Sequence, residues 1–156
     1  MIIGPLVPER ALARIALLAV SLMLVASPAL AESKPAHAVP KSLAGKKVAC
    51  VLKVQEVGVK SGKDLNAELC RSLGTAGLQV VKDQDSAELL VTGSIVLRPD
   101  AKSVVSGRGV ATLKAHDDGL TMGSAMAHLE DKDAAALGAA LVKTLSEQVV
   151  SSIIQQ

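Results

Sequence analysis

The sequence predicts an α+β fold, with the element order β-α-β-β-β-β-α and two helices on one face of a mostly antiparallel five-stranded sheet. Several segments alternate apolar and polar residues with the two-residue period of half-buried strands. Two other segments repeat apolar residues every four positions, as helices that cover a core do. A strand, a helix and a second strand come first, and three strands with short connections precede the last helix. This order is typical of a sheet whose helices gather on one side.

The segment 87–98 is predicted to be the strand around which the domain is organised. One face of this strand is apolar, with Leu89, Val91, Ile95 and Leu97. The opposite face carries Thr92, Ser94 and Arg98. The alternation indicates a half-buried strand, and we expect the rest of the chain after residue 45 to pair with it or to cover its apolar face.

The amino-terminal segment 1–31 has the features of a secretory signal peptide. Arg10 and Arg14 precede an apolar run over 15–26, and the small-residue sequence Ala29-Leu30-Ala31 follows it. This pattern predicts cleavage after Ala31 and a periplasmic or secreted protein with no membrane span after cleavage. The alternative is an uncleaved membrane helix, but the run is short against the ~20 residues that cross a bilayer.

After the predicted cleavage site, residues 32–45 are interpreted as a flexible leader because they contain two prolines and show no periodicity. A single α+β domain is then expected over 46–156. Its first strand spans about 47–57, and a helix over about 63–73 follows. Ser61 and Asp64 resemble a capping box, and Gly74 has the position of a C′ residue. A short strand over 78–82 completes a parallel crossover.

The second half of the domain alternates strands and turns before the closing helix. A strand is predicted over 104–115, and its Gly107 and Gly109 would let a helix approach the sheet closely. The segment 116–119 ends in Asp-Gly and indicates a hairpin turn before a strand over 120–130. The final helix is expected over 134–154. Its apolar stripe consists of Leu137, Leu141, Leu145, Val149 and Ile153.

Composition argues against several classes of partner. The chain has 156 residues, enough for one domain, and its 17 basic and 15 acidic residues leave a net charge of +2. This balance gives no reason to expect nucleic acid. The chain contains no Phe, Tyr or Trp. Because bases and sugar rings are commonly bound by stacking on aromatic side chains, we expect neither nucleic acid nor carbohydrate as a ligand.

No motif in the chain indicates an enzyme, a metal site or a cofactor. His116 with Asp117 and Asp118 offers metal-ligating groups at a turn, but a selective site needs three or four converging ligands, so a solvated turn is favoured. No G-x-S-x-G elbow is present. The Gly107-Arg108-Gly109 sequence is not followed by a helix that could receive a phosphate. We therefore expect no catalytic residues, no metal and no cofactor.

The segment Ala87–Ile95, Ala-Glu-Leu-Leu-Val-Thr-Gly-Ser-Ile, resembles a pattern in small bacterial envelope domains. These are the amino-terminal domain of the Tol-Pal β-propeller protein, the curli-secretion lipoproteins and the flagellar-assembly T proteins. The resemblance extends over about 46–154, including the Ala-rich closing helix. Unlike those proteins, this chain is expected to have no lipidated Cys, no second domain and no membrane hairpin. The resemblance implies an envelope assembly or binding module and transfers no site residues.

The sheet face opposite the helices is the candidate docking surface for another envelope protein or for a second copy of this chain. Its candidate residues are Val96, Arg98, Arg108, Val110, Met122 and Met126. Methionines suit a contact that adapts its shape. The alternative is an ordinary mixed, solvated face. A second functional hypothesis is a carrier for a small apolar ligand, which would need a closed apolar pocket of ~300 Å³ or more.

Cys50 and Cys70 are a candidate disulfide. Secretion would expose both thiols to an oxidising compartment. Both residues are expected at the interface between the first strand and the first helix. Against a bridge, a helix packs on a sheet at ~10 Å, which usually leaves Cα atoms beyond the ~7 Å that a disulfide can span. A pair of buried free cysteines is the alternative.

Overall fold

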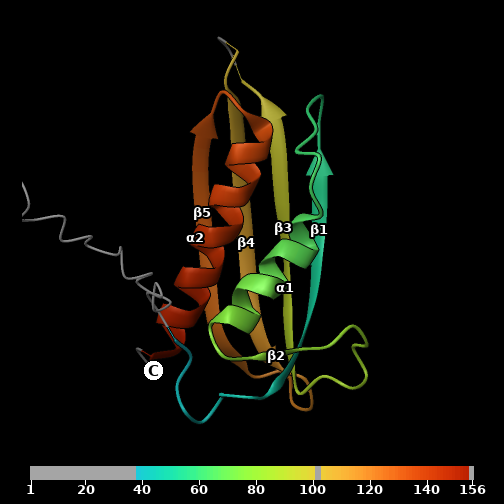
Figure 1. Ribbon diagram of the computed structural model, residues 1–156, viewed down its shortest axis with the longest axis vertical. Coiled ribbons are helices and arrows are strands. Elements are labelled where there is room, and N and C mark those ends of the chain that lie inside the picture. The colour runs from blue at the N-terminus through green and yellow to red at the C-terminus, as the bar shows by residue number, and fades with distance from the viewer. Residues whose placement is uncertain (1–37, 101–102, 155–156) are drawn as a thin grey trace, which may run out of the picture. The chain divides into compact units, whose positions relative to one another are not determined.

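The computed structural model describes residues 38–100 and 103–154, and its element order matches the predicted one (Figure 1). The elements are β1 (Lys47–Glu56), α1 (Leu65–Thr75), β2 (Gln79–Val80), β3 (Leu89–Pro99), β4 (Val105–Ala115), β5 (Thr121–Asp131) and α2 (Ala134–Ile154).

The five strands form one sheet in the order β2-β1-β3-β4-β5. β1 runs parallel to both β2 and β3, whereas the β3–β4 and β4–β5 pairs are antiparallel. The predicted five-stranded sheet is therefore confirmed, and it is mixed, because β1 lies between two parallel neighbours. The β1–β3 pair is parallel because the chain enters β3 in the same direction as β1, and no hairpin joins the two strands.

Both helices lie on one face of the sheet (Figure 1). The buried leucines Leu69 and Leu73 of α1 and Leu141 of α2 pack with the strands in a single core. Gly107 explains how closely α2 approaches, because a Cβ atom at this position would lie 2.4 Å from Leu141 Cδ1. The small residues predicted on this strand therefore make room for helix side chains.

The ends of α1 differ in detail from the sequence prediction. Asp64, not Ser61, is the N-cap, and its side chain accepts a hydrogen bond from the Ala67 backbone N–H at 3.0 Å. At the other end Gly77, not Gly74, adopts a positive φ of 115°. The Leu78 N–H donates to the Leu73 carbonyl at 3.2 Å. The helix therefore ends in a Schellman motif two residues later than predicted.

Part of the segment expected to be a leader belongs to the packed domain. Val39 is 8% exposed and Leu43 is 3% exposed, and both join the core. The Val39 N–H donates to the Ala76 carbonyl at 2.9 Å, and the Gly45 N–H donates to the Gly77 carbonyl at 2.8 Å. Residues 38–45 therefore cover the end of α1. This packing is favourable because it removes the two apolar side chains from water.

The predicted signal peptide, its cleavage site at Ala29 and Ala31, and His37 lie outside the described residues. Within 38–100 and 103–154, no helix is both long enough and apolar enough to cross a membrane.

Candidate interaction surface

The sheet face opposite the helices is built by the residues that alternate with the core positions of β3, β4 and β5. The strand register places these side chains in rows across the sheet. One row contains Ser94, Val110 and Met126, and the next contains Val96, Arg108 and His128. Val110 is 44% exposed and Met126 is 75% exposed. An apolar cross-strand pair therefore faces solvent at the centre of this surface.

The rows around this pair are polar or charged. Thr112 and Ser124 pair on one side, and Arg108 and His128 pair on the other. Arg98, which was also predicted on this face, is exposed at the end of β3. The arrangement is an apolar centre with hydrogen-bonding and cationic groups around it, which is the general composition of a protein contact surface.

Val96 and Met122, also predicted on this face, are less exposed than Val110 and Met126. Val96 is half-buried in its row. Met122 lies at a β-bulge, where the register shifts between Leu113 and Lys114, and it packs half-buried against the core. The extra residue at a bulge interrupts the strict alternation of faces, so Met122 does not extend the exposed apolar pair.

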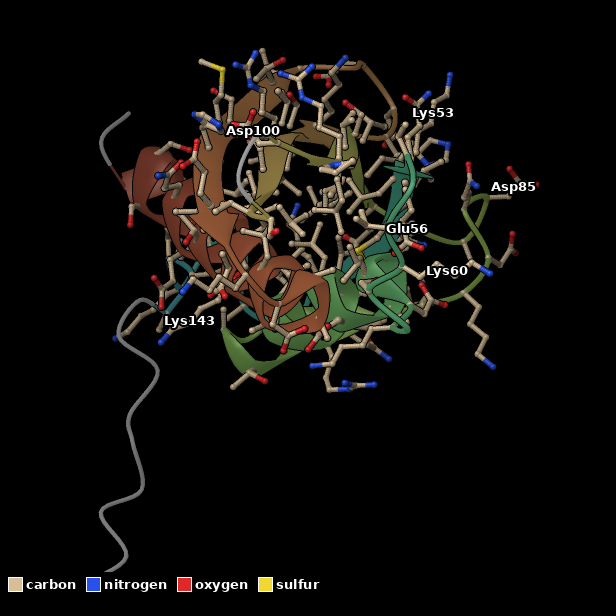
Figure 2. The ribbon with its side chains drawn as sticks, turned by 90° about the horizontal axis from the view of Figure 1, so that it is seen from above. Lys53, Glu56, Lys60, Asp85, Asp100 and Lys143 are labelled. Atoms are coloured by element: carbon tan, nitrogen blue, oxygen red, sulfur yellow. A yellow bond between two sulfur atoms is a disulfide. The ribbon has the colours of Figure 1, made fainter. Side chains whose placement is uncertain are left out.

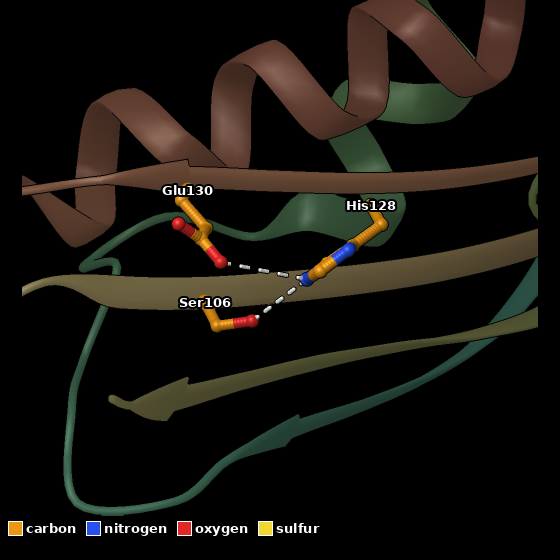
Figure 3. Close-up of polar contacts among 3 residues, drawn as sticks. All are labelled: Ser106, His128 and Glu130. Carbon is orange, nitrogen blue, oxygen red and sulfur yellow. Dashed lines mark hydrogen bonds and ion pairs between the residues drawn. The ribbon is translucent and has the colours of Figure 1, made fainter. Parts of the chain in front are cut away.

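Three polar residues of β4 and β5 come together beside this surface. His128 Nε2 lies 3.0 Å from Ser106 Oγ and 4.0 Å from Glu130 Oε1 (Figure 3). Ser106 is 4% exposed. The register of β4 and β5 produces this cluster, because it pairs Ser106 with Glu130 directly. No motif in the sequence signals a contact of this kind.

The geometry of this cluster argues against a nucleophilic serine. In a catalytic arrangement the serine uses one ring nitrogen of the histidine, and the acid holds the other nitrogen. Here Ser106 and Glu130 both approach Nε2 of His128. The residues also lie on the face that the helices leave uncovered. The contacts therefore fix the orientation of the His128 ring at the border of the candidate surface.

His116 shows no metal-binding arrangement in the structure. Its backbone N–H donates to the Glu88 carbonyl at 2.9 Å, which ties the turn after β4 to the start of β3. Within the described ranges, no group of three or more His, Cys, Asp or Glu side chains could hold a metal ion.

Cys50 of β1 and Cys70 of α1 form a disulfide, and their Cα atoms are 5.9 Å apart. β2 pairs only with Lys47 and Val48, so at Cys50 β1 is the edge strand of the sheet, and α1 approaches it there closely enough for the bridge. The usual helix-to-sheet packing distance, which argued against a disulfide, is therefore not reached between these two residues. A disulfide is typical of proteins that fold in an oxidising compartment outside the cytoplasm.

A groove of about 680 Å³ lies beside this disulfide, between α1 and the β2 side of the sheet. Its lining includes both cysteines and the exposed cationic residues Arg71 and Lys82. The groove is open to solvent. It is therefore not the closed pocket that a carrier was expected to need, although its volume exceeds the expected minimum.

Comparison with known proteins connects the chain to others through its fold. No protein-family model matches the chain. A search of curated proteins also finds no match.

Among solved structures, the PelC dodecamer from Paraburkholderia phytofirmans matches with a TM-score of 0.53 and 15% sequence identity, over 72% of this chain and 93% of that one. The hypothetical protein CT253 from Chlamydia trachomatis matches with a TM-score of 0.53 and 9% identity, over 71% and 99%. At these identities the likeness establishes a shared small α+β fold. Neither structure comes from the three families that the sequence resembles.

Proposed function

We propose that this protein is a non-enzymatic module of the bacterial envelope, located in the periplasm or secreted, which associates with protein partners or with further copies of itself through the uncovered sheet face. The observation that carries the proposal is the exposed cross-strand pair of Val110 and Met126 at the centre of that face. The disulfide supports the location. The resemblance of segment 87–95 to envelope domains supports the class of protein.

Self-association receives separate support from the fold. PelC, whose fold this chain shares, forms a dodecamer. The physical reason for association would be the same for a contact with another protein and for a contact with a second copy of this chain. Burial of two exposed apolar side chains on rigid strands is favourable, and a strand presents them without a further loss of backbone freedom.

The test is a double substitution, Val110→Glu with Met126→Glu. Two carboxylates in place of the apolar pair should prevent association, because a contact would have to bury charge without a partner. Both side chains are exposed, so the fold should remain intact. Sedimentation velocity measures self-association, and pull-down from envelope extract measures partner binding.

The matched control is Thr112→Glu with Ser124→Glu, which places the same charges on the same two strands in the neighbouring cross-strand pair. A smaller loss of association is expected for this control than for the Val110 and Met126 variant. If the Val110 and Met126 variant assembles and captures partners as the parent does, the uncovered face is not the contact surface.

A carrier of small ligands is the second candidate, and the groove of about 680 Å³ favours it. The apolar part of its lining would accept an aliphatic group, and the exposed Arg71 and Lys82 would attract an anionic group. Isothermal titration with a medium-chain fatty acid distinguishes the two functions. Saturable binding that Arg71→Glu abolishes would favour the carrier.

A further inference from the structure

The sheet has two edges, and the outer edge of β5 is free along much of its length. The Ser124 N–H points outward and donates to Ser152 Oγ of α2 at 2.9 Å. Backbone groups in a strand alternate in direction, so those of Met126, His128 and Glu130 also point outward. Within the described residues, these three outward N–H groups have no hydrogen-bond partner.

The opposite edge is formed by β2 and β1, and β2 covers only the beginning of β1. The Val81 N–H donates to the Val48 carbonyl at 2.9 Å. Beyond Val48, the side chain of Asn66 makes the hydrogen bonds to the edge of β1 that a neighbouring strand would otherwise make. Its Nδ2 donates to the Cys50 carbonyl at 3.2 Å, and its Oδ1 accepts from the Leu52 N–H at 3.0 Å.

After the contact with Asn66, the outer edge of β1 is open. The outward groups from the Leu52 carbonyl to the Glu56 N–H have no hydrogen-bond partner among the described residues. Val54, on the helix side of this stretch, is 37% exposed. Each end of the sheet therefore presents a short row of unpaired backbone groups, which is a template for pairing with another strand.

The two free edges run in the same direction. β1 is parallel to β3, and β5 is antiparallel to β4, which is itself antiparallel to β3. The β5 edge of one copy can therefore pair only in parallel with the β1 edge of a second copy that has the same orientation. Such a contact is heterologous, and repetition of it can close a ring.

The charges near the two edges are opposite. Residues 47–63, around β1, contain four lysines and one glutamate, whereas residues 121–133, around β5, contain three acids and one lysine. Lys53 and Lys60 lie around β1 in Figure 2. Lys53 and Glu130 both project from the uncovered face near the open stretches. A β5–β1 contact therefore joins opposite charges, whereas a contact between two identical edges does not.

We propose that copies of this chain associate head to tail, with the β5 edge of one copy in parallel beside the β1 edge of the next. The inference rests on the proposed self-association and extends it from the sheet face to the sheet edges. The sheet would continue from copy to copy, and all uncovered faces would lie on the same side. Lys53 of one copy would lie near Glu130 of its neighbour, and opposite charges across a strand pair stabilise it.

A charge-reversal experiment tests this contact. Lys53→Glu and Glu130→Lys, each in a separate chain, should weaken self-association by about tenfold or more, because each brings like charges together. An equal mixture of the two variants should associate like the parent, since every contact in an alternating assembly again joins opposite charges. One chain that carries both substitutions should also recover. Sedimentation velocity over a concentration series gives the dissociation constants.

The matched controls are Lys143→Glu on α2 and Asp85→Lys in the loop before β3, which change the net charge equally at exposed positions away from the two edges. Circular dichroism melts verify that all variants fold. If a charge reversal prevents folding, Lys53→Gln and Glu130→Gln replace it and should still weaken association.

The outcomes separate this inference from the proposed function. If the parent associates and the edge variants behave like the controls, the edge contact is wrong, while the uncovered face can still be the contact surface. Single variants that weaken association without rescue in the mixture would also overturn the head-to-tail contact. A parent chain that stays monomeric at every concentration would overturn both this contact and self-association, although binding of other proteins through the face would stand.

Discussion

Glu56 and Ser61 show how single residues hold the loop after β1. Both the backbone N–H and the hydroxyl of Ser61 donate to Glu56 Oε1, the first at 3.0 Å. The side-chain hydrogen bond from Ser61, and next the backbone one, lower the pKa of the Glu56 carboxyl. Ser61 is buried, although the sequence suggested a role for it as a helix cap. These contacts keep the loop folded back on the end of the strand.

Ser61→Ala should destabilise the protein by about 1 kcal/mol at neutral pH, since it removes one hydrogen bond to an ionised group in contact with solvent. The pKa of Glu56 is lower in the folded state, so its contribution is present above the unfolded pKa and is lost as pH falls through the folded pKa. The difference between parent and variant should therefore shrink in acid. Urea unfolding at neutral pH and well below the ordinary Glu value of 4.5 measures it.

Ser86→Ala is the control for this experiment, because the Ser86 hydroxyl is exposed and donates to the Asp83 carbonyl, not to a carboxylate. Its effect should not change with pH. A Ser61→Ala effect that is equally large in acid would contradict the assigned role of the Glu56 carboxylate.

At the scale of an element, α2 is the main cover of the β4–β5 half of the sheet. Leu137, Leu141 and Leu145 are completely or almost completely buried, as their four-residue spacing predicted. Leu141 also fills the space that Gly107 leaves open. The helix is therefore held by interlocked side chains as well as by its apolar surface.

Leu141→Ala should cost ~2–5 kcal/mol in the free energy of unfolding, because it leaves a cavity against the Gly107 backbone as well as losing apolar burial. Lys143→Ala, at an exposed position of the same helix, is the control and should change little. Urea melts of both variants give the values. A loss below ~1 kcal/mol for Leu141→Ala would mean that the surrounding side chains close the cavity.

At the scale of the whole molecule, the disulfide joins α1 to β1 across 20 positions of sequence. The core contains no aromatic residue and is filled by aliphatic side chains. The covalent link is therefore a substantial addition to the stability of the fold. In the chain-entropy account, a loop of this length stabilises the fold by restricting the unfolded chain.

Protein purified from an oxidising compartment should therefore carry no free thiol. Alkylation without reductant followed by mass spectrometry should find neither cysteine modified, and two modified cysteines would reject the bridge. Cys50→Ala with Cys70→Ala should lower the free energy of unfolding by about 3 kcal/mol. Reduction of the parent before the melt provides the matched comparison, since it breaks the bond and keeps both side chains.

The sequence by itself determined the element order, the two helical stripes and the sides of the sheet on which most residues lie. Periodicity carries this information because the side-chain direction repeats every two residues in a strand and every 3.6 in a helix. The prediction that Val110 and Met126 lie on the uncovered face depended on nothing more than this alternation and the position of the helices.

The tertiary structure decided the features that depend on pairing between distant residues. The parallel β1–β3 pair, the bulge that turns Met122 toward the core and the cluster of Ser106, His128 and Glu130 all follow from strand register. The Asn66 contact with β1 likewise needs the helix in place. Local sequence periodicity does not predict such pairings, because their energies come from contacts that form only when the chain has folded.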